Sequence, residues 1–185
     1  MSRQYWTELL AWATADGTAV ANTTTETIIF PNVTLPANYL SDGRVIELIA
    51  RGRLSAVSAA TMRFRLRWGG VAGTLVWDSG IITSNSPTAA LWSIPSLHIQ
   101  VRSNGSTGSV FVMGECYVGS AAAATVASAT GAPAVVLGGS GGDDTPAGVT
   151  VDLTADTALS LTATWGAASA SNTLTGHQYL LKSLN

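Results

Sequence analysis

The chain has 185 residues, of which 46% are hydrophobic and 11% are charged, and its formal net charge is -2. An average globular domain carries about 25% charged residues, so Ser, Thr, Asn and Gly must supply most of the polar surface here. The length fits one domain that buries its own core. The slightly acidic balance gives no electrostatic case for nucleic acid, so no nucleic-acid partner is predicted.

Cysteine content and hydropathy indicate the cellular compartment in which the protein is expected. Cys116 is the single cysteine, which excludes an internal disulfide framework and indicates a small buried hydrophobe. No uninterrupted apolar run reaches the roughly 18 residues that cross a bilayer, so no membrane partner is predicted. Glu8 interrupts the apolar part of the N-terminal segment, which makes it a poor signal peptide. We expect a protein made in a cytoplasm, or assembled there into something larger.

The first 24 residues divide into a part rich in large apolar side chains and a part of small and polar ones. Tyr5, Trp6, Leu9, Leu10 and Trp12 belong to the first part. Their spacing allows a short helix, or an arm that docks on something. Whether these side chains pack on their own domain or on a partner is left open by the sequence.

Most of the remaining chain alternates apolar and polar residues with the period of half-buried strands. The clearest case puts Met62, Phe64 and Leu66 on one face and arginines on the other. The segments expected to form strands are 26–30, 44–54, 61–68, 74–78, 91–102, 109–118, 159–165 and 173–184. Strands separated by turns throughout predict an all-β sandwich, jelly roll or barrel. Pro31 and Pro36 are expected to bend the chain between them rather than to allow a ladder.

Two stretches shape the second half of the chain. The last two expected strands are joined by the small residues of 166–172, and a strand at that position needs neighbours in a sheet, because an unpaired edge is a liability. Trp165 is expected between the sheets. Residues 119–148 are almost all Ala, Gly, Ser and Thr around the apolar island 135–137, which leaves a short strand, an extended arm or a loop as alternatives.

Motifs for chemistry are incomplete. The glycine-rich piece 138–142 lacks the Lys and Ser/Thr of a phosphate-binding loop, and Asp143-Asp144 fits a solvated turn better than a calcium site. His98 and His177 lack ligand spacing with each other or with a cysteine, and no Gly-x-Ser-x-Gly elbow is present. The sequence therefore predicts no catalytic, metal or cofactor site, and no enzyme.

A group of arginines is the one candidate functional cluster in the sequence. Arg51, Arg53, Arg63, Arg65 and Arg67 make up most of the basic residues, and the last three share one face of a strand. This face is either ordinary solvent-exposed surface or a contact stripe for a carboxylate-bearing partner, which the guanidinium fork suits.

The segment 109–118 is apolar on both faces. Val110, Val112 and Cys116 alternate with Phe111, Met113 and Tyr117. One face can pack against a second sheet, and the other then needs cover from elsewhere. We therefore expect Phe111, Met113 and Tyr117 to lie at an oligomer interface.

The order of strands and turns resembles that of a known family. The resemblance rests on the segments 31–40, 43–44, 50–54, 63–70, 78–80, 152–154, 159–165 and 170–173. Over residues 22–185 this pattern is similar to the jelly-roll virion structural proteins of tailed bacteriophages, which are seen as capsid decoration (cement), head-fibre and minor tail proteins. The resemblance implies an antiparallel jelly-roll sandwich over 25–185, a homotrimer and no catalysis or cofactor, with residues 1–24 as an N-terminal arm or short helix outside the pattern.

Within that family, a capsid decoration protein fits a small single domain of low charge best. Such a protein would be made in the host cytoplasm and would bind the major capsid protein on the exterior of the capsid, stabilising the head shell. The aromatic N-terminal residues and Arg63, Arg65 and Arg67 would supply the contacts. The alternative is a tail fibre, spike tip or minor tail protein that binds a host-surface glycan.

Overall fold

The computed structural model describes residues 7–84, 90–119, 134–139 and 147–184. Within these ranges the regular structure consists of strands alone, which confirms the all-β fold class. The strands are β1 (Glu8–Trp12), β2 (Val20–Ala21), β3 (Thr27–Ile28), β4 (Val33–Leu35), β5 (Val45–Ser55), β6 (Ala60–Trp68), β7 (Thr74–Asp78), β8 (Ile82–Ser84), β9 (Ala90–Ser103), β10 (Gly108–Val118), β11 (Ala134–Gly139), β12 (Val149–Val151), β13 (Thr157–Trp165) and β14 (Thr173–Ser183).

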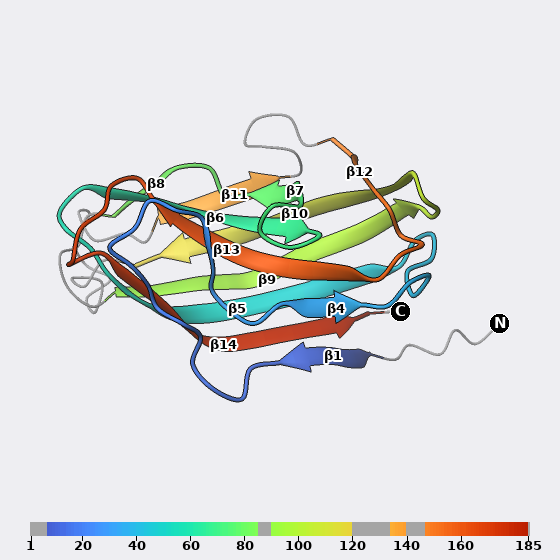
Figure 1. The fold of residues 1–185 in the computed structure, drawn as a ribbon, viewed down its shortest axis with the longest axis horizontal. Coiled ribbons are helices and arrows are strands. Elements are labelled where there is room, and N and C mark those ends of the chain that lie inside the picture. Colours follow the sequence, from blue (N-terminus) through green and yellow to red (C-terminus); the bar gives the residue numbers. More distant parts are fainter. Residues whose placement is uncertain (1–6, 85–89, 120–133, 140–146, 185) are drawn as a thin grey trace.

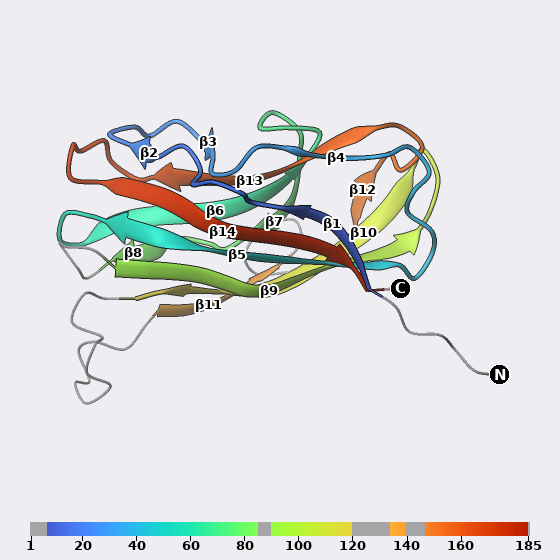
Figure 2. The ribbon, with the colours of Figure 1, turned by 90° about the horizontal axis from the view of Figure 1, so that it is seen from below.

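The strands form two facing layers in jelly-roll order (Figures 1 and 2). One layer runs β1-β14-β5-β9, and the other runs β4-β13-β6-β7. Taken in chain order, these eight strands alternate between the layers except at the β6–β7 hairpin, and this is the connectivity of the double-sheet jelly roll. The antiparallel jelly-roll sandwich expected from the sequence is therefore the observed fold.

Strands inserted between β9 and β13 make the two sides of the sandwich unequal. β10 extends the first layer beyond β9, and β11 pairs with β10 and also touches β7 through Gly139 and Asp78. The layers are thus joined into one curled sheet on that side. On the opposite side β1 and β3 end the sheet, so the described residues leave a seam there between the layers.

The last two long strands lie in different layers. β13 pairs with β6, whereas β14 pairs with β5, so residues 166–172 cross between the layers instead of forming a hairpin. Asn172 fixes this crossing: its Oδ1 accepts the Val57 N–H at 2.9 Å and its Nδ2 donates to the Ala167 carbonyl at 3.0 Å.

The core lies between the layers and contains several aromatic side chains. Trp165 is 1% exposed, and its Nε1 donates to the Val20 carbonyl at 3.1 Å, which confirms its expected place between the sheets. Met62, Phe64 and Leu66 face inward from β6 as the alternation predicted. Their burial removes apolar surface from water and supplies the main favourable term in folding.

Irregularities in the long strands adjust which residues face inward. Pro95 lies in the interior of β9, where the register with β5 and with β10 shifts, and a bulge is where a strand tolerates proline. The pairing of β14 with β5 shifts between Gly176 and Gln178. A Cβ on Gly176 would lie 2.2 Å from the Phe30 ring, so glycine allows that ring to pack directly on β14.

The structure corrects two expectations about short segments and, for the apolar island 135–137, selects the short strand from the alternatives left open. Residues 8–12 and 20–21 of the expected N-terminal arm form β1 and β2, which both pair with β14, and no helix occurs in the described part of residues 1–24. Between Pro31 and Pro36 the chain forms β4, a three-residue ladder on β13, because an edge strand tolerates flanking prolines. The apolar island 135–137 lies in β11, whereas 120–133 and 140–146 lie outside the described residues.

Candidate functional site

The outer face of β6 carries a network of arginines and carboxylates, which comprises Glu26, Arg63, Arg65, Arg67 and Asp78. Asp78 accepts from Arg63 Nε at 3.1 Å and from Arg65 Nε at 3.0 Å. Glu26 accepts from Arg67 Nε at 2.8 Å and from Arg65 Nη1 at 3.0 Å. Each carboxylate therefore bridges two guanidinium groups, and Arg65 joins the two halves of the network.

The side chains of this network are partly buried, so their ion pairs are less exposed to solvent than ordinary surface pairs. The Asp78 side chain is 3% exposed, and it also accepts the Gly80 N–H at 2.7 Å. Burial by itself would raise the pKa of Glu26, but hydrogen bonds from Arg67 and Thr162, together with the nearby positive charges, hold that pKa below its ordinary value. The hydrogen bond to Glu26 in turn raises the pKa of Arg67.

The three arginines of β6 are thus occupied within the chain. They attach the segment before β3 and the end of β7 to the middle of β6. The sequence analysis considered a solvent-exposed face and a partner contact for this stripe, but not a network within the chain. The acidic residue that ends the strand 74–78 was the sequence signal for such a network. Contact of Arg63, Arg65 and Arg67 with a partner stays a prediction.

β1 places part of the apolar N-terminal group on the surface. Leu9 is 49% exposed and Trp12 is 59% exposed, while Leu10 and Ala11 pack against the core. β1 pairs with β14 along one edge, and no described strand pairs with its other edge. Tyr5 and Trp6, the other members of the predicted contact group, lie outside the described residues.

The start of β1 is held by a polar contact with the β4–β5 connection. The Tyr39 hydroxyl donates to Glu8 Oε2 at 2.6 Å, and the Arg44 guanidinium lies 4.6 Å from the centre of the Tyr39 ring. Partial burial and this bond to the Glu8 carboxylate raise the pKa of Tyr39. β1 is therefore anchored at its first residue as well as along β14.

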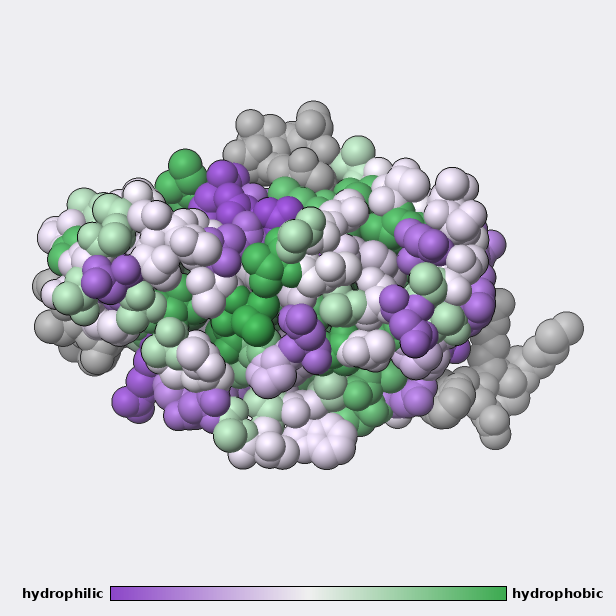
Figure 3. All heavy atoms as spheres, viewed as in Figure 1, coloured by the Kyte–Doolittle hydropathy of each residue, from purple (hydrophilic) through white to green (hydrophobic). Residues whose placement is uncertain are grey.

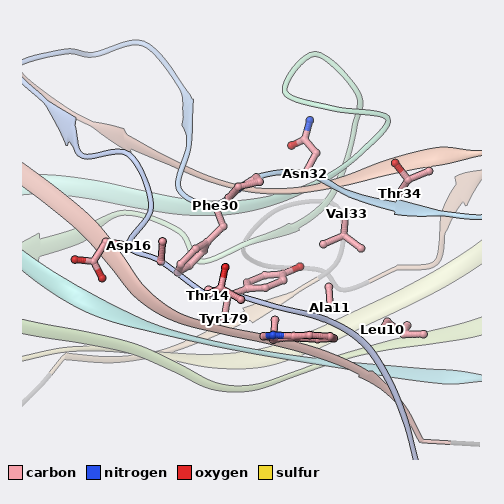
Figure 4. A pocket seen from close by; sticks show the side chains of 13 residues that line it. Leu10, Ala11, Thr14, Asp16, Phe30, Asn32, Val33, Thr34 and Tyr179 are labelled. Carbon is pink, nitrogen blue, oxygen red and sulfur yellow. The ribbon is translucent and has the colours of Figure 1, made fainter.

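A cleft of about 450 Å³ occupies the seam between β1 and the segment that leads into β4; we call it the edge cleft (Figure 4). Its lining comes from residues 10–16, residues 30–34 and Tyr179. The space-filling view in Figure 3 shows hydrophobic residues gathered in the middle of this side of the molecule, with hydrophilic residues around them. The open side of the sandwich therefore exposes a partly apolar hollow.

Aromatic rings form the inner wall of the edge cleft. The Phe30 and Tyr179 rings lie 5.1 Å apart at 41°, and burial raises the pKa of the Tyr179 hydroxyl. Polar atoms line the rim: Asn32 Oδ1 accepts from Ser160 at 2.7 Å, and Asp16 Oδ1 lies 2.7 Å from His177 Nδ1. Ring faces beside fixed polar groups suit a ligand that has an apolar face and hydroxyl groups.

The outer face of β10 is less exposed than the sequence predicts. The Arg102 guanidinium covers the Phe111 ring at 4.2 Å, and the Tyr117 hydroxyl donates to Glu115 at 2.6 Å, a bond that raises the pKa of Tyr117. Met113 is 46% exposed. An oligomer interface at Phe111, Met113 and Tyr117 stays a prediction, with Met113 as its most accessible member.

Groups that could perform chemistry are dispersed over the described residues. His98 lies on β9 near Ser96 and Glu47, whereas His177 lies on β14 with Asp16. Burial raises the pKa of the Cys116 thiol, which makes it an unreactive core group. No group of three or more His, Cys, Asp or Glu side chains in the described ranges could hold a metal ion, and Asp143-Asp144 lies outside those ranges.

Comparison with known proteins gives a distant structural similarity. No family model and no curated protein matches the sequence. A solved structure, the CBM2 module of the evolved Dit of Lactobacillus casei BL23 phage J-1, aligns over 99% of this chain and 98% of its own, with 10% sequence identity and a TM-score of 0.40. The jelly-roll assignment rests on the strand order of this chain. No helix in the described residues is long and apolar enough to cross a membrane.

Proposed function

We propose that this chain is a structural protein of a tailed-bacteriophage virion, and specifically a capsid decoration (cement) protein that binds the major capsid protein on the outside of the head shell. The strand and turn pattern that resembles phage jelly-roll proteins supports the virion assignment. In this proposal the protein acts by binding and performs no catalysis. The observation that carries the docking surface is the exposed apolar outer edge of β1.

An edge strand with large apolar side chains is uncommon on a protein that stays alone, because it invites pairing with another chain. Leu9 and Trp12 are exposed on β1, whose outer edge pairs with no described strand. Buried aromatic side chains carry much of the energy of protein interfaces. An extended segment of the shell could add to β1 as a further strand, with Trp12 filling a pocket of the partner.

The test replaces Leu9 and Trp12 together by Ser and measures occupancy on particles stripped of the native protein. Both side chains are about half exposed, so the fold should survive, while occupancy should fall at least tenfold, which corresponds to about 1.4 kcal/mol. The matched control is Ile81→Ser, which removes a side chain that is 67% exposed beside the other layer. Full occupancy of the double variant, or an equal loss in the control, would contradict docking through β1.

We further propose that the protein is a homotrimer, with the outer face of β10 in the subunit contact. Met113 supplies the exposed apolar surface there. Light scattering of the free protein should give three times the 18.9 kDa chain mass. A monomer at micromolar concentration would remove this part of the proposal.

The edge cleft favours a second candidate, a tail fibre, spike tip or minor tail protein that binds a host-surface glycan. The Phe30 and Tyr179 rings and the polar rim match the needs of a sugar ring and its hydroxyls. Ala15→Trp would fill the cleft from an exposed position on its wall. If this variant loses binding to host cells and the Leu9/Trp12 variant keeps full shell occupancy, the tail role replaces the decoration role.

A further inference from the structure

A second hollow, of about 490 Å³, lies on the outer face of the other layer, over β14, β5 and β9; we call it the β5 hollow. Its lining residues are Arg51, Gly52, Arg53, Leu91, Trp92, Ser93, His177 and Gln178. The sheet register places Arg51 between Gln178 and Ser93, and Arg53 beside Leu91. Two outward-facing arginines from one strand therefore lie in the middle of the hollow.

These two arginines have no partner among the described residues. The other described basic side chains are engaged: Arg63, Arg65, Arg67 and Lys182 form ion pairs, and Arg44 and Arg102 stack on aromatic rings. Arg51 and Arg53 form none of these contacts within the described part of the chain. The two positive charges lie two residues apart on one strand face and repel each other, and an anion bound between them would relieve that repulsion.

The walls of the hollow offer contacts of other kinds. The register shift in β14 brings His177 and Gln178 together onto the wall, and Asp16 holds the His177 ring at 2.7 Å. Ser93 and Gln178 can donate hydrogen bonds to hydroxyl groups. Leu91 is 66% exposed and provides an apolar wall next to Arg53. The hollow therefore combines positive charge, neutral hydrogen-bonding groups and an apolar surface.

The floor of the hollow is rigid. A Cβ on Gly52 would lie 2.0 Å from the Thr175 carbonyl oxygen and 2.6 Å from Trp92 Nε1, so the strand backbone packs directly on the buried indole. Trp92 Nε1 donates to the same Thr175 carbonyl at 3.2 Å, which ties β9 to β14 beneath β5. Arg51 and Arg53 thus project from a backbone that is fixed from below, and a preformed site loses less entropy on binding.

We propose that the β5 hollow binds an anionic saccharide. Its carboxylate or phosphate would lie between the guanidinium groups of Arg51 and Arg53, which bind such groups through paired hydrogen bonds. The sugar ring would pack against Leu91, and its hydroxyls would reach Ser93 and Gln178. This site lies apart from the β1 edge and does not depend on the decoration role.

The experiment titrates the full chain with three probes and follows the backbone amides of Ser93 and Gln178 by NMR. The probes are a trigalacturonate, the neutral galactose trisaccharide and glycerol 3-phosphate. The charged probes should shift these amides and bind at least about tenfold more tightly than the neutral trisaccharide. Comparison of the two charged probes shows whether carboxylate or phosphate is preferred, and either preference supports an anion site.

Matched variants assign the binding to the arginines. Arg51→Gln with Arg53→Gln should weaken binding of the better charged probe at least about tenfold, whereas Arg102→Gln, which removes one exposed arginine at the far end of β9, should change it less than about twofold. Arg51→Lys with Arg53→Lys keeps the positive charge but removes the forked guanidinium donors. The affinity of this variant for the probe should therefore lie between those of the wild type and the double glutamine variant. Thermal unfolding of each variant shows that the exposed substitutions leave the fold intact.

Three results would overturn the proposal. The first is the absence of any amide shift with either charged probe up to about 10 mM, which is weaker than a specific site would bind. The second is equal affinity for the neutral and charged trisaccharides. The third is unchanged affinity in the Arg51/Arg53 double glutamine variant. None of these results bears on shell occupancy, so the decoration role is tested separately.

Discussion

Strands β5 and β6 both carry arginines at alternate positions on their outer faces, yet the two faces differ completely in how those charges are used. On β6, Arg63, Arg65 and Arg67 are tied to two carboxylates and are between 17% and 29% exposed. On β5, Arg51 and Arg53 are exposed and have no described partner. The same local pattern thus yields a structural network in one layer and a surface open to a ligand in the other.

Neighbouring elements account for the difference. β6 lies beside the end of β7, which supplies Asp78, and beneath the segment before β3, which supplies Glu26. β5 lies between β14 and β9, whose outward residues at the same level are Gln178, Ser93 and other side chains without negative charge. An alternating arginine strand therefore does not reveal its role until its neighbours are known.

The largest effect is expected for Asp78→Ala. This change removes a carboxylate that is 3% exposed and leaves Arg63 and Arg65 without it, so the free energy of unfolding should fall by about 3–5 kcal/mol. Asp16→Ala is the control, because the Asp16 side chain is 64% exposed and His177 is its one ion-pair partner among the described residues; its cost should stay below about 1 kcal/mol. Denaturant unfolding measures both. A loss of less than about 1 kcal/mol for Asp78→Ala would mean that the ion pairs on the β6 face contribute no more to stability than the arginines on the β5 face.

An acid titration of stability should separate Glu26 from the other carboxylates. The folded state lowers the pKa of Glu26 from its ordinary 4.5. The charged form therefore stabilises the fold above about that pH, and this contribution is lost as the pH falls through the lowered value. Glu26→Gln should cost about 1–3 kcal/mol at neutral pH, because it leaves arginine donors partly unpaired.

The difference between wild type and Glu26→Gln should shrink as the pH falls from about 4.5 through the lowered pKa of Glu26, because below that pKa both proteins carry a neutral side chain at this position. The pKa of Asp152 is also lowered, by its hydrogen bonds from Thr154, but it titrates equally in both proteins. Urea unfolding at a series of pH values gives the measurement. A difference that stays constant with pH would mean that the charge of Glu26 is not what stabilises the β6 face.

The smallest effect on stability is expected on the β5 face. Arg51→Gln with Arg53→Gln removes two exposed charges without breaking a described ion pair, so the free energy of unfolding should change by less than about 0.5 kcal/mol. Relief of the repulsion between the two arginines offsets part of any loss. Thermal unfolding at low ionic strength provides the check. A loss above about 1.5 kcal/mol would show that these arginines support the fold after all.

Much of the fold could be predicted from the alternation of apolar and polar residues in the sequence. The strands at 44–54, 61–68 and 74–78 are found within a residue or two of their expected limits, because long strands with one buried face repeat with period two. β1, β2, β4, β8 and β12 were not predicted. They are short, and their formation depends on a long strand that already offers its edge: β1 and β2 on β14, β4 on β13, β8 on β6, and β12 on β10.

The candidate sites were harder to predict from the sequence than the strands. The sequence singled out the five arginines of β5 and β6, but it did not separate Arg51 and Arg53 from the other three. It also treated Leu9, Leu10 and Trp12 as parts of an arm, whereas β14 draws them into the sheet. The edge cleft had no sequence signal, because its walls come from segments 10–16 and 30–34 and from Tyr179 near the other end of the chain.

By itself the sequence determined which side of β5 and of β6 faces the core, because successive side chains of a strand point to opposite faces and only one face of these strands is mainly apolar. The tertiary structure decided which strands are neighbours, and with them the partners of every charge. Thr162 and Glu26, which meet at 2.6 Å, are 136 residues apart, and Asp16 and His177 are 161 apart. Contacts over such separations follow from the jelly-roll crossings between layers, and the alternation within one strand carries no information about them.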